Sequence, residues 1–235
     1  MTKRIAIIPA RSGSTRIPNK NIHDFCGRPM MSYPIQAAEE SGLFDRIHVS
    51  TDSQQYADIA AELGFPVDFL RPANQARNDS PMYDILRYVL RWYDDRGEVF
   101  DEVCMPYATA ALLEGEDLVG GHEVFEDHGA DQPVMAVGEH RAPIERALEI
   151  GADGTLQWIY PEKRYMHSQD CVTAYHDAGA FLFFGRKRLL ETDEAIFTDY
   201  LPYILPRWKI TDIDEIQDLH LAELMYLGRQ AKRDA

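Results

Sequence analysis

The sequence has few cysteines and little positive charge, and both scarcities exclude classes of protein. Cys26, Cys104 and Cys171 are far apart, odd in number and form no C-x-x-C pair. This pattern argues against a disulfide framework and a structural zinc site, and it is typical of the reducing cytoplasm. Lys and Arg together number 24 against 39 Asp and Glu, which gives a net charge of −15. Because a nucleic-acid backbone binds cationic faces, we expect no nucleic-acid partner.

Long apolar runs are missing as well. No apolar stretch approaches the ~20 residues of a membrane-spanning helix, and the first residues lack the apolar segment of a signal peptide. We therefore expect a cytoplasmic protein with no membrane partner. The 235 residues, 45% of them hydrophobic, suffice for one sizeable α/β domain and are too few for two of average size. The sequence predicts a single domain over residues 1–235.

Several common catalytic motifs are absent. The sequence contains no G-x-x-x-x-G-K-[ST], G-x-G-x-x-G or H-E-x-x-H motif, and no nucleophile elbow accompanied by a Ser-His-Asp order. These absences argue against a P-loop enzyme, a dinucleotide-binding site of the usual kind, a zinc protease and an acyl-transfer hydrolase.

The N-terminus instead has an apolar run followed by a polar, cationic loop. Residues 5–8 predict a buried strand of a parallel sheet, and Arg11, Arg16 and Lys20 follow it among Ser and Gly residues. Open α/β sheets bind ligands beyond the carboxyl ends of their strands. Since small residues let backbone N–H groups approach phosphate oxygens, and Arg contacts such oxygens in pairs, the loop favours a polyphosphate. The alternative is an ordinary basic surface loop.

Strand and helix patterns alternate along the first half of the chain. We expect strands at 4–10, 46–51, 67–70 and 102–107, helices at 30–41, 54–63, 81–94 and about 115–128, then short strands at 133–138, 147–150, 155–159 and 179–184 and a last helix at 214–229. The alternation predicts a βαβ architecture with a mainly parallel sheet. The β-rich segment at about 133–180 is interpreted as an insertion, either a lid or a dimerisation arm.

Two carboxylates precede the last predicted helix. Asp212 and Asp214 are two residues apart, so on a strand their side chains face the same side. Carboxylate oxygens in that arrangement suit Mg²⁺. The alternative is that both acids cap the last helix or occupy its first turn.

Six segments together resemble one enzyme family. Residues 8–21, 27–31 and 49–52 are similar to the signatures of cytidylyltransferases that activate acidic sugars, the CMP-sugar synthetases. Residues 168–170, 175–179 and 212–214 resemble the pseudaminic acid branch of that family. The resemblance covers nearly the whole chain. It implies a Rossmann-like, GT-A-like nucleotidyltransferase fold with three layers, and a β-rich insertion that packs on a partner subunit in a homodimer.

The resemblance also implies a reaction. CMP would pass from CTP to the anomeric hydroxyl of a nine-carbon acidic sugar, pseudaminic acid, with release of pyrophosphate and with Mg²⁺ as cofactor. Arg11, Lys20 and Asp214 would be catalytic, the two cations neutralising the phosphates, and Asp212 and Asp214 would bind the metal. The nucleotide site would comprise Ala10, Arg11, Ser12, Gly13, Ser14, Arg16, Lys20, Asn21, Arg71, Asp79 and Ser80. The acidic sugar would be bound by Tyr107, Thr109, Gln169, Asp170, Tyr175, Asp177 and Gly179.

Within these sets some residues have a second interpretation. Arg71 would donate to the cytosine edge, whereas Asp79 or Ser80 could simply cap the helix that follows. Five positions depart from the family pattern. Thr15, Ala111 and Ala180 replace a Lys, a Pro and a Gln, and Leu182-Phe183 replaces a Tyr-Trp pair. The departures leave open a synthetase for sialic, legionaminic or 3-deoxy-octulosonic acid, and a catalytically inactive sensor that binds CTP.

Overall fold

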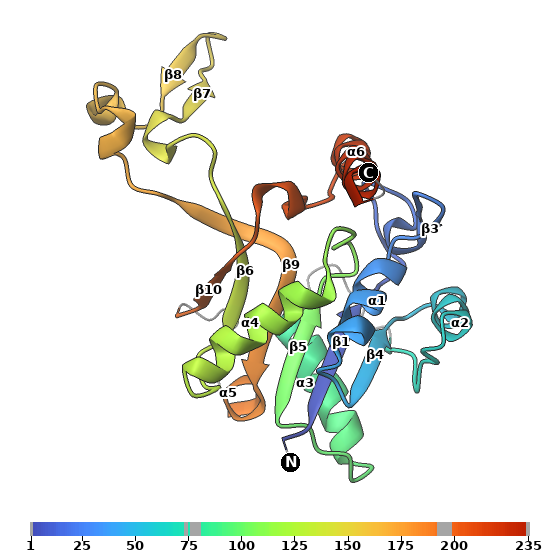
Figure 1. The fold of residues 1–235 in the computed structure, drawn as a ribbon. Helices are drawn as coiled ribbons and strands as arrows, with labels where there is room; N and C mark the ends of the chain where they lie inside the picture. The colour runs from blue at the N-terminus through green and yellow to red at the C-terminus, as the bar shows by residue number, and fades with distance from the viewer. Residues whose placement is uncertain (1, 73–74, 76–80, 192–198, 234–235) are drawn as a thin grey trace.

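The centre of the computed structural model, which describes residues 2–72, 75, 81–191 and 199–233, is a six-stranded sheet in the order β10-β6-β9-β5-β1-β4 (Figure 1). Its strands are β1 (Arg4–Pro9), β4 (Arg46–Ser50), β5 (Glu102–Pro106), β6 (Val134–Glu139), β9 (Tyr175–Gly185) and β10 (Leu201–Ile204). Neighbouring strands are parallel except that β9 runs antiparallel to both β5 and β6. The predicted α/β fold with a mainly parallel sheet is confirmed.

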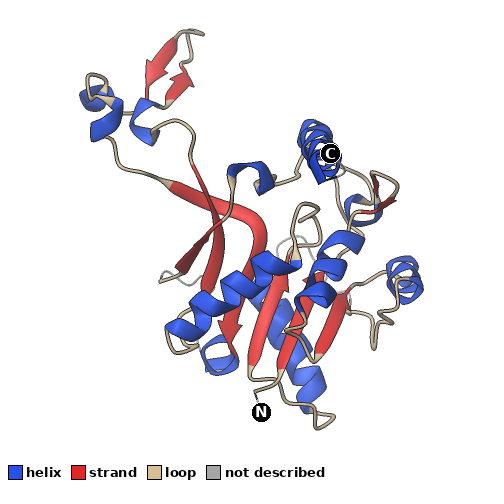
Figure 2. Ribbon diagram, in the orientation of Figure 1, coloured by secondary structure: helices blue, strands red, loops and turns tan. Residues whose placement is uncertain are grey.

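Helices cover both faces of this sheet and make three layers (Figure 2). They are α1 (Ser32–Ser41), α2 (Gln54–Glu62), α3 (Met82–Asp94), α4 (Gly115–Asp127), α5 (Arg186–Glu191) and α6 (Ile216–Arg233). Helices α1 and α4 pack on one face, and α3 and α5 pack on the other. Helix α6 packs against a small ribbon of β2 (Asp24–Phe25) and β3 (Arg28–Pro29). Among the described helices, none is long and apolar enough to span a membrane.

The apolar run of the N-terminus forms β1 because both of its faces are buried. Ile5 and Ile7 pack with α3, whereas Ala6 packs with α1 and α4, and none of the three is exposed. Side chains alternate between the two faces of a strand, so a strand buried on both sides needs an unbroken apolar run. β1 therefore lies inside the sheet, and its carboxyl end opens toward the polar loop.

Three expectations about single elements are corrected by the structure. Residues 67–70 form no strand, and Phe69 packs on α3 instead. The strand expected at 179–184 is longer, from Tyr175 to Gly185, because its first half pairs with β6. The last helix begins at Ile216 rather than at residue 214 and continues to Arg233.

An arm projects from the sheet between β6 and β9 (Figure 1). It contains a hairpin of β7 (Leu148–Ile150) and β8 (Leu156–Trp158) and the short helical turns η3 (Ile144–Arg146), η4 (Pro161–Lys163) and η5 (Ser168–Asp170). β6 and the whole of β9 belong to the main sheet. The projecting part is thus residues 140–174, narrower than the insertion expected at about 133–180.

Candidate functional site

A cavity of about 380 Å³ lies where β1 and β5 end. Nine of the predicted site residues line it: Arg11, Ser14, Arg16, Lys20, Asn21, Arg71, Tyr107, Thr109 and Asp214. Its other lining includes Thr15, Met82 and Ile85. The cavity occupies the place where an α/β sheet binds its ligand. Sequence reasoning missed the apolar wall formed by Met82 and Ile85, because apolar residues at helical spacing resemble core positions.

Backbone and side-chain hydrogen bonds fix the loop after β1. Asp52, which follows β4, accepts from the Ser12 backbone N–H at 2.9 Å and from its hydroxyl at 3.2 Å. Asn21 donates through Nδ2 to the carbonyl of Arg11 at 2.9 Å, and Arg11 donates through Nη1 to the carbonyl of Gly13 at 3.2 Å. Asp52 is a positioning residue that the analysis of the sequence left out of the site. Its place just beyond a strand end was the available signal.

Lys20 and Asp214 meet at the cavity although they are far apart in the sequence. Lys20 Nζ donates to the Ile213 carbonyl at 2.6 Å and to Asp214 Oδ1 at 3.2 Å. Arg16 Nη2 lies 2.7 Å from the same Oδ1 atom. Two cations that we expect to bind phosphate, Lys20 and Arg16, are therefore in direct contact with Asp214, which we expect to bind the metal.

The side chain that caps α6 belongs to Asp218 and not to Asp212 or Asp214. Asp218 Oδ2 accepts from the backbone N–H groups of Asp214 at 3.0 Å and Glu215 at 2.7 Å, so Asp218 caps the start of α6. The carboxylate of Asp214 contacts Lys20 and Arg16 instead. This arrangement leaves Asp214 oriented toward the cavity.

Asp212 lies in crowded acidic surroundings. Desolvation raises the pKa of Asp212, and the nearby carboxylates of Asp214, Asp177 and Asp218 raise it further, whereas Lys20 lowers it. Gly179 has a φ of +61°, and a Cβ there would lie 3.2 Å from Asp212 Oδ1. A divalent cation would relieve this repulsion, and hard carboxylate oxygens are the donors that Mg²⁺ prefers. The chemistry of these carboxylates therefore suits such an ion. Asp214 lines the cavity, whereas Asp212 lines a separate pocket with Thr211 and Asp218.

Arg71 carries a buried guanidinium. Its side chain lines the cavity, the residue is only 4% exposed, and Nε, Nη1 and Nη2 have no partner among the described residues. Burial lowers the pKa of the guanidinium, Asp52 raises it and Arg11 lowers it. Leaving buried donors unmatched costs free energy. A ligand with acceptor atoms at this wall would satisfy them.

Tyr107, Asp177 and Gly179 form a connected group near the cavity. The Tyr107 hydroxyl donates to Asp177 Oδ2 at 3.2 Å, and Asp177 Oδ1 accepts from the Gly179 N–H at 2.8 Å. Burial and then the charge of Asp177 raise the pKa of Tyr107 well above its usual range. The phenol thus remains a hydrogen-bond donor at neutral pH.

Other predicted residues lie elsewhere. Gln169 and Asp170 belong to η5 on the arm, are exposed and do not line the cavity. Tyr175 is 45% exposed at the first position of β9, and Ala10 is buried in the core. Asp79 and Ser80 lie outside the described residues.

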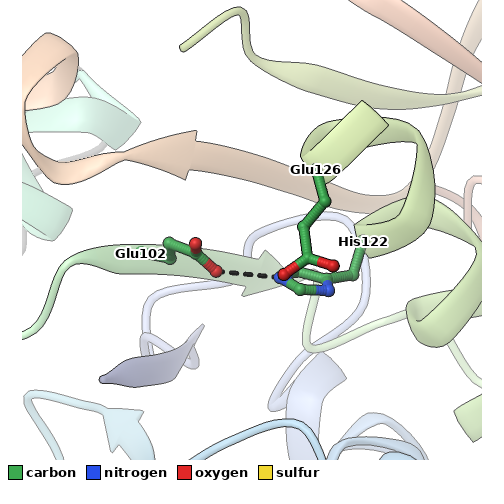
Figure 3. Close-up of side chains that lie close together, drawn as sticks. All are labelled: Glu102, His122 and Glu126. Atoms are coloured by element: carbon green, nitrogen blue, oxygen red, sulfur yellow. Dashed lines mark hydrogen bonds and ion pairs between the residues drawn. The ribbon is translucent and has the colours of Figure 1, made fainter. Parts of the chain in front are cut away.

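A second group of possible metal ligands lies at the other end of the strands, where β1 and β5 begin (Figure 3). Glu102 begins β5, and His122 and Glu126 are one turn apart on α4. Arg4 already contacts both carboxylates, at 2.7 Å from Glu102 and 3.0 Å from Glu126, and His122 Nε2 is 2.8 Å from Glu102. Since Arg4 supplies the positive charge, we interpret the group as an ion-pair network that joins β1, β5 and α4.

Comparisons with known proteins place the chain among cytidylyltransferases. A family model described as Cytidylyltransferase matches residues 5–232. The chain is 36% identical to the pseudaminic acid cytidylyltransferase of Campylobacter jejuni, over 95% of this chain and 96% of that protein. It is 28% identical to the N-acylneuraminate cytidylyltransferase of Escherichia coli, over 94% of this chain and 51% of that protein.

Two solved structures share the fold. A CMP:2-keto-3-deoxy-manno-octonic acid synthetase complexed with CTP gives a TM-score of 0.69 at 14% identity, covering 97% of this chain and 100% of the other. A 4-diphosphocytidyl-2C-methyl-D-erythritol synthase from Anaerococcus prevotii gives a TM-score of 0.60 at 13% identity, covering 97% and 99%. At these identities the likeness concerns the fold alone.

Proposed function

The chain belongs to the cytidylyltransferase family, and we propose that it transfers CMP from CTP to the anomeric hydroxyl of pseudaminic acid, with release of pyrophosphate. The observation that carries the chemistry is the meeting of Lys20, Arg16 and Asp214 at the cavity beyond β1. The choice of sugar rests on the relative from Campylobacter jejuni, which matches the chain almost end to end.

The cations of the loop after β1 would bind the triphosphate. Arg11, Arg16 and Lys20 line one cavity, so they can neutralise charge that builds up on the phosphates as pyrophosphate leaves. Arg11 offers a paired contact and Lys20 a single mobile charge. These residues need no covalent step, because holding the α-phosphorus in line with the attacking hydroxyl and stabilising charge supply most of the rate in phosphoryl transfer.

Asp212 and Asp214 would hold Mg²⁺. When bound, the ion would supply positive charge to the phosphate oxygens and lower the barrier for departure of pyrophosphate. The positive charge of the ion would offset the repulsion between carboxylates that helps to raise the pKa of Asp212. Lys20 and Arg16, which both contact Asp214, are close enough to the proposed metal site to bind the phosphates beside it.

Arg71 would select the base. Its buried guanidinium can donate to O2 and N3 of cytosine, both of which are acceptors. Uracil carries a hydrogen on N3, so an N–H group of Arg71 would face the N3–H group of the base, and no hydrogen bond could form. Such a mismatch costs several kcal/mol when it is buried.

The sugar would lie beside Tyr107, Thr109 and Asp177, and a second copy of the chain would complete its site. The arm presents Gln169 and Asp170 away from its own cavity, together with exposed Ile150, Leu156 and Tyr165. Large exposed apolar patches mark interaction surfaces. We infer a homodimer in which each arm reaches the partner. The free thiols of Cys26, Cys104 and Cys171 suit a reducing cytoplasm.

A substrate panel tests this function. Purified protein with CTP and Mg²⁺ would be supplied with pseudaminic, sialic, legionaminic and 3-deoxy-octulosonic acid, and pyrophosphate release would give kcat/KM for each. We expect the highest value for pseudaminic acid. A higher value for another acid would move the specificity to that acid, and Thr15 at the cavity wall would be the first residue to exchange for Lys. CTP binding with no pyrophosphate from any acid would identify an inactive sensor.

A further inference from the structure

The segment that carries Arg71 is irregular, yet neighbouring elements hold it firmly. Residues 68–71 belong to no helix or strand. Asp68 Oδ2 accepts from the Tyr93 hydroxyl of α3 at 2.5 Å. The next residue, Phe69, stacks on two rings, with centroid distances of 4.8 Å to His48 of β4 and 4.2 Å to Trp92 of α3. Two of the three residues before Arg71, Asp68 and Phe69, are therefore held by β4 and α3.

These tethers are connected to each other. The Tyr93 hydroxyl lies 3.0 Å from His48 Nδ1. Because the single hydroxyl proton goes to Asp68, the Nδ1–H of His48 donates to the Tyr93 oxygen. Burial lowers the pKa of His48 to about 4, with smaller effects from Asp68, Arg46 and Arg71. The ring is therefore neutral near pH 7 and places no further charge beside Arg71.

Arg71 needs such support because its own head group has none. No described residue accepts a hydrogen bond from its guanidinium, so only its backbone N–H, which donates to the Thr51 carbonyl at 2.7 Å, ties it directly. A side chain that must meet a flat base edge has to be held to within a fraction of an ångström. The packing of residues 68–70 is what remains to supply that precision.

We propose that Tyr93, His48 and Trp92 are positioning residues for base recognition, which hold residues 68–71 so that the Arg71 guanidinium is presented to the cytosine edge. The inference rests on the proposed function and adds residues behind the cavity wall to it. None of the three touches the ligand. They act through Asp68 and Phe69.

The test compares two variants that each lose one buried hydroxyl. Tyr93→Phe keeps the ring and removes the tether to Asp68, whereas Tyr33→Phe removes a buried hydrogen bond of 2.6 Å to the Phe25 carbonyl in a different core cluster. For both we would measure Tm, the Kd of CTP and of UTP without sugar, and KM and kcat. Base binding is the same in the ground and transition states, so a fault in it raises KM and leaves kcat unchanged.

We expect Tyr93→Phe to raise Kd and KM for CTP about three- to tenfold and to narrow the ratio between CTP and UTP, with kcat retained at saturation. Tyr33→Phe should lower Tm and leave the ratio unchanged. A Tyr93→Phe protein that loses stability but keeps the full CTP preference would overturn the proposal. If the wild type itself fails to prefer CTP, the proposed function fails as well, so the two failures are distinguishable.

A second pair of variants tests the stacking tether. Trp92→Leu removes the ring under Phe69, and Trp92→Phe keeps a ring there. The CTP preference should fall in Trp92→Leu and be restored in Trp92→Phe. If Trp92→Leu keeps the wild-type preference for CTP over UTP, the stack has no role in base recognition.

Discussion

At the scale of single residues, the cavity and its surroundings contain charged groups that the protein itself satisfies poorly. The Arg71 guanidinium is buried without an acceptor among the described residues, and the pKa of Asp212 is raised in an acidic cluster. Both features oppose folding and favour a ligand, since CTP offers acceptors and a divalent ion offers positive charge. Local conflicts of this kind concentrate at functional sites. Substitutions at such residues should change the stability of the protein and its ligand affinity in opposite directions.

Arg71→Met should separate stability from binding. Removing the three nitrogen atoms that have no acceptor relieves a desolvation penalty of about 1–3 kcal/mol, so Tm without ligand should stay equal or rise. The increase of Tm that CTP produces in the wild type should be lost. Thermal unfolding with and without CTP measures both effects. Arg91→Met on the exposed side of α3 is the control and should keep the CTP response. A large loss of stability in Arg71→Met would mean that a partner holds the guanidinium in the free protein.

Asp214→Asn should abolish most turnover while the fold persists. The amide keeps the shape but loses the charge that contacts Lys20 and Arg16 and that would bind Mg²⁺. Pyrophosphate release should fall by at least about 100-fold, and Tm should change little because the side chain is partly exposed. Asp58→Asn on the exposed face of α2 is the matched control. Excess EDTA should silence the wild type, and activity that survives EDTA would contradict the metal site.

At the scale of elements, the buried runs were predictable and the irregular segments were not. The unbroken apolar run of β1 and the apolar spacing of α3 left few alternatives. Residues 67–70 have the composition of a strand, but β4 is the sheet edge in the described structure, and Phe69 stacks on α3 instead. Tertiary packing overrode a weak local preference there.

The same limit applies to the site. Resemblance located Lys20 and Asp214, whose contact joins the two ends of the chain. It could not show that Asp52 holds the loop through Ser12, because that hydrogen bond depends on how β1 and β4 lie side by side. The unmatched state of Arg71 also depends on what surrounds it, which no local sequence pattern specifies.

The packing of β4 on α3 predicts a pH dependence of stability. His48 has its pKa lowered from 6.5 to about 4, so between these values the unfolded chain binds a proton that the native protein does not. The free energy of unfolding should therefore rise with pH across this window and fall on acidification, by roughly 3 kcal/mol in total. Urea unfolding of His48→Gln from pH 4 to pH 7 should give a shallower slope than the wild type. His220→Gln on the exposed side of α6 should keep the wild-type slope, and identical slopes in all three proteins would contradict the assignment.

At the scale of the whole molecule, the arm carries a surface that suits a second copy of the chain. In the hairpin, Leu148 pairs with Trp158 and Ile150 with Leu156, so all four side chains lie on one face. They are 45%, 37%, 75% and 68% exposed, respectively. Glu149 and Gln157 pair on the opposite face. A two-stranded hairpin with one apolar face is marginal by itself and gains stability when that face is covered.

Leu156→Lys should therefore shift the protein from dimer to monomer, because a charge would be buried in the interface. Gln157→Lys adds the same charge to the opposite face and should leave the dimer intact. Light scattering after size exclusion measures the mass of each. If both variants keep the wild-type mass, the apolar face is not the interface.

Mixing two inactive proteins tests whether the arm serves the partner's cavity. Lys20→Ala should inactivate the cavity, and the double variant Gln169→Ala and Asp170→Ala should inactivate the arm. If each arm completes the opposite site, a mixed dimer contains one cavity with intact Lys20 that faces an intact arm. Unfolding the two variants together and refolding them should then restore part of the pyrophosphate release, whereas refolding each alone should not. Introducing Leu156→Lys into both variants should prevent this recovery, because no mixed dimer forms. No recovery in a mixture that does form mixed dimers would show that Gln169 and Asp170 act within their own chain.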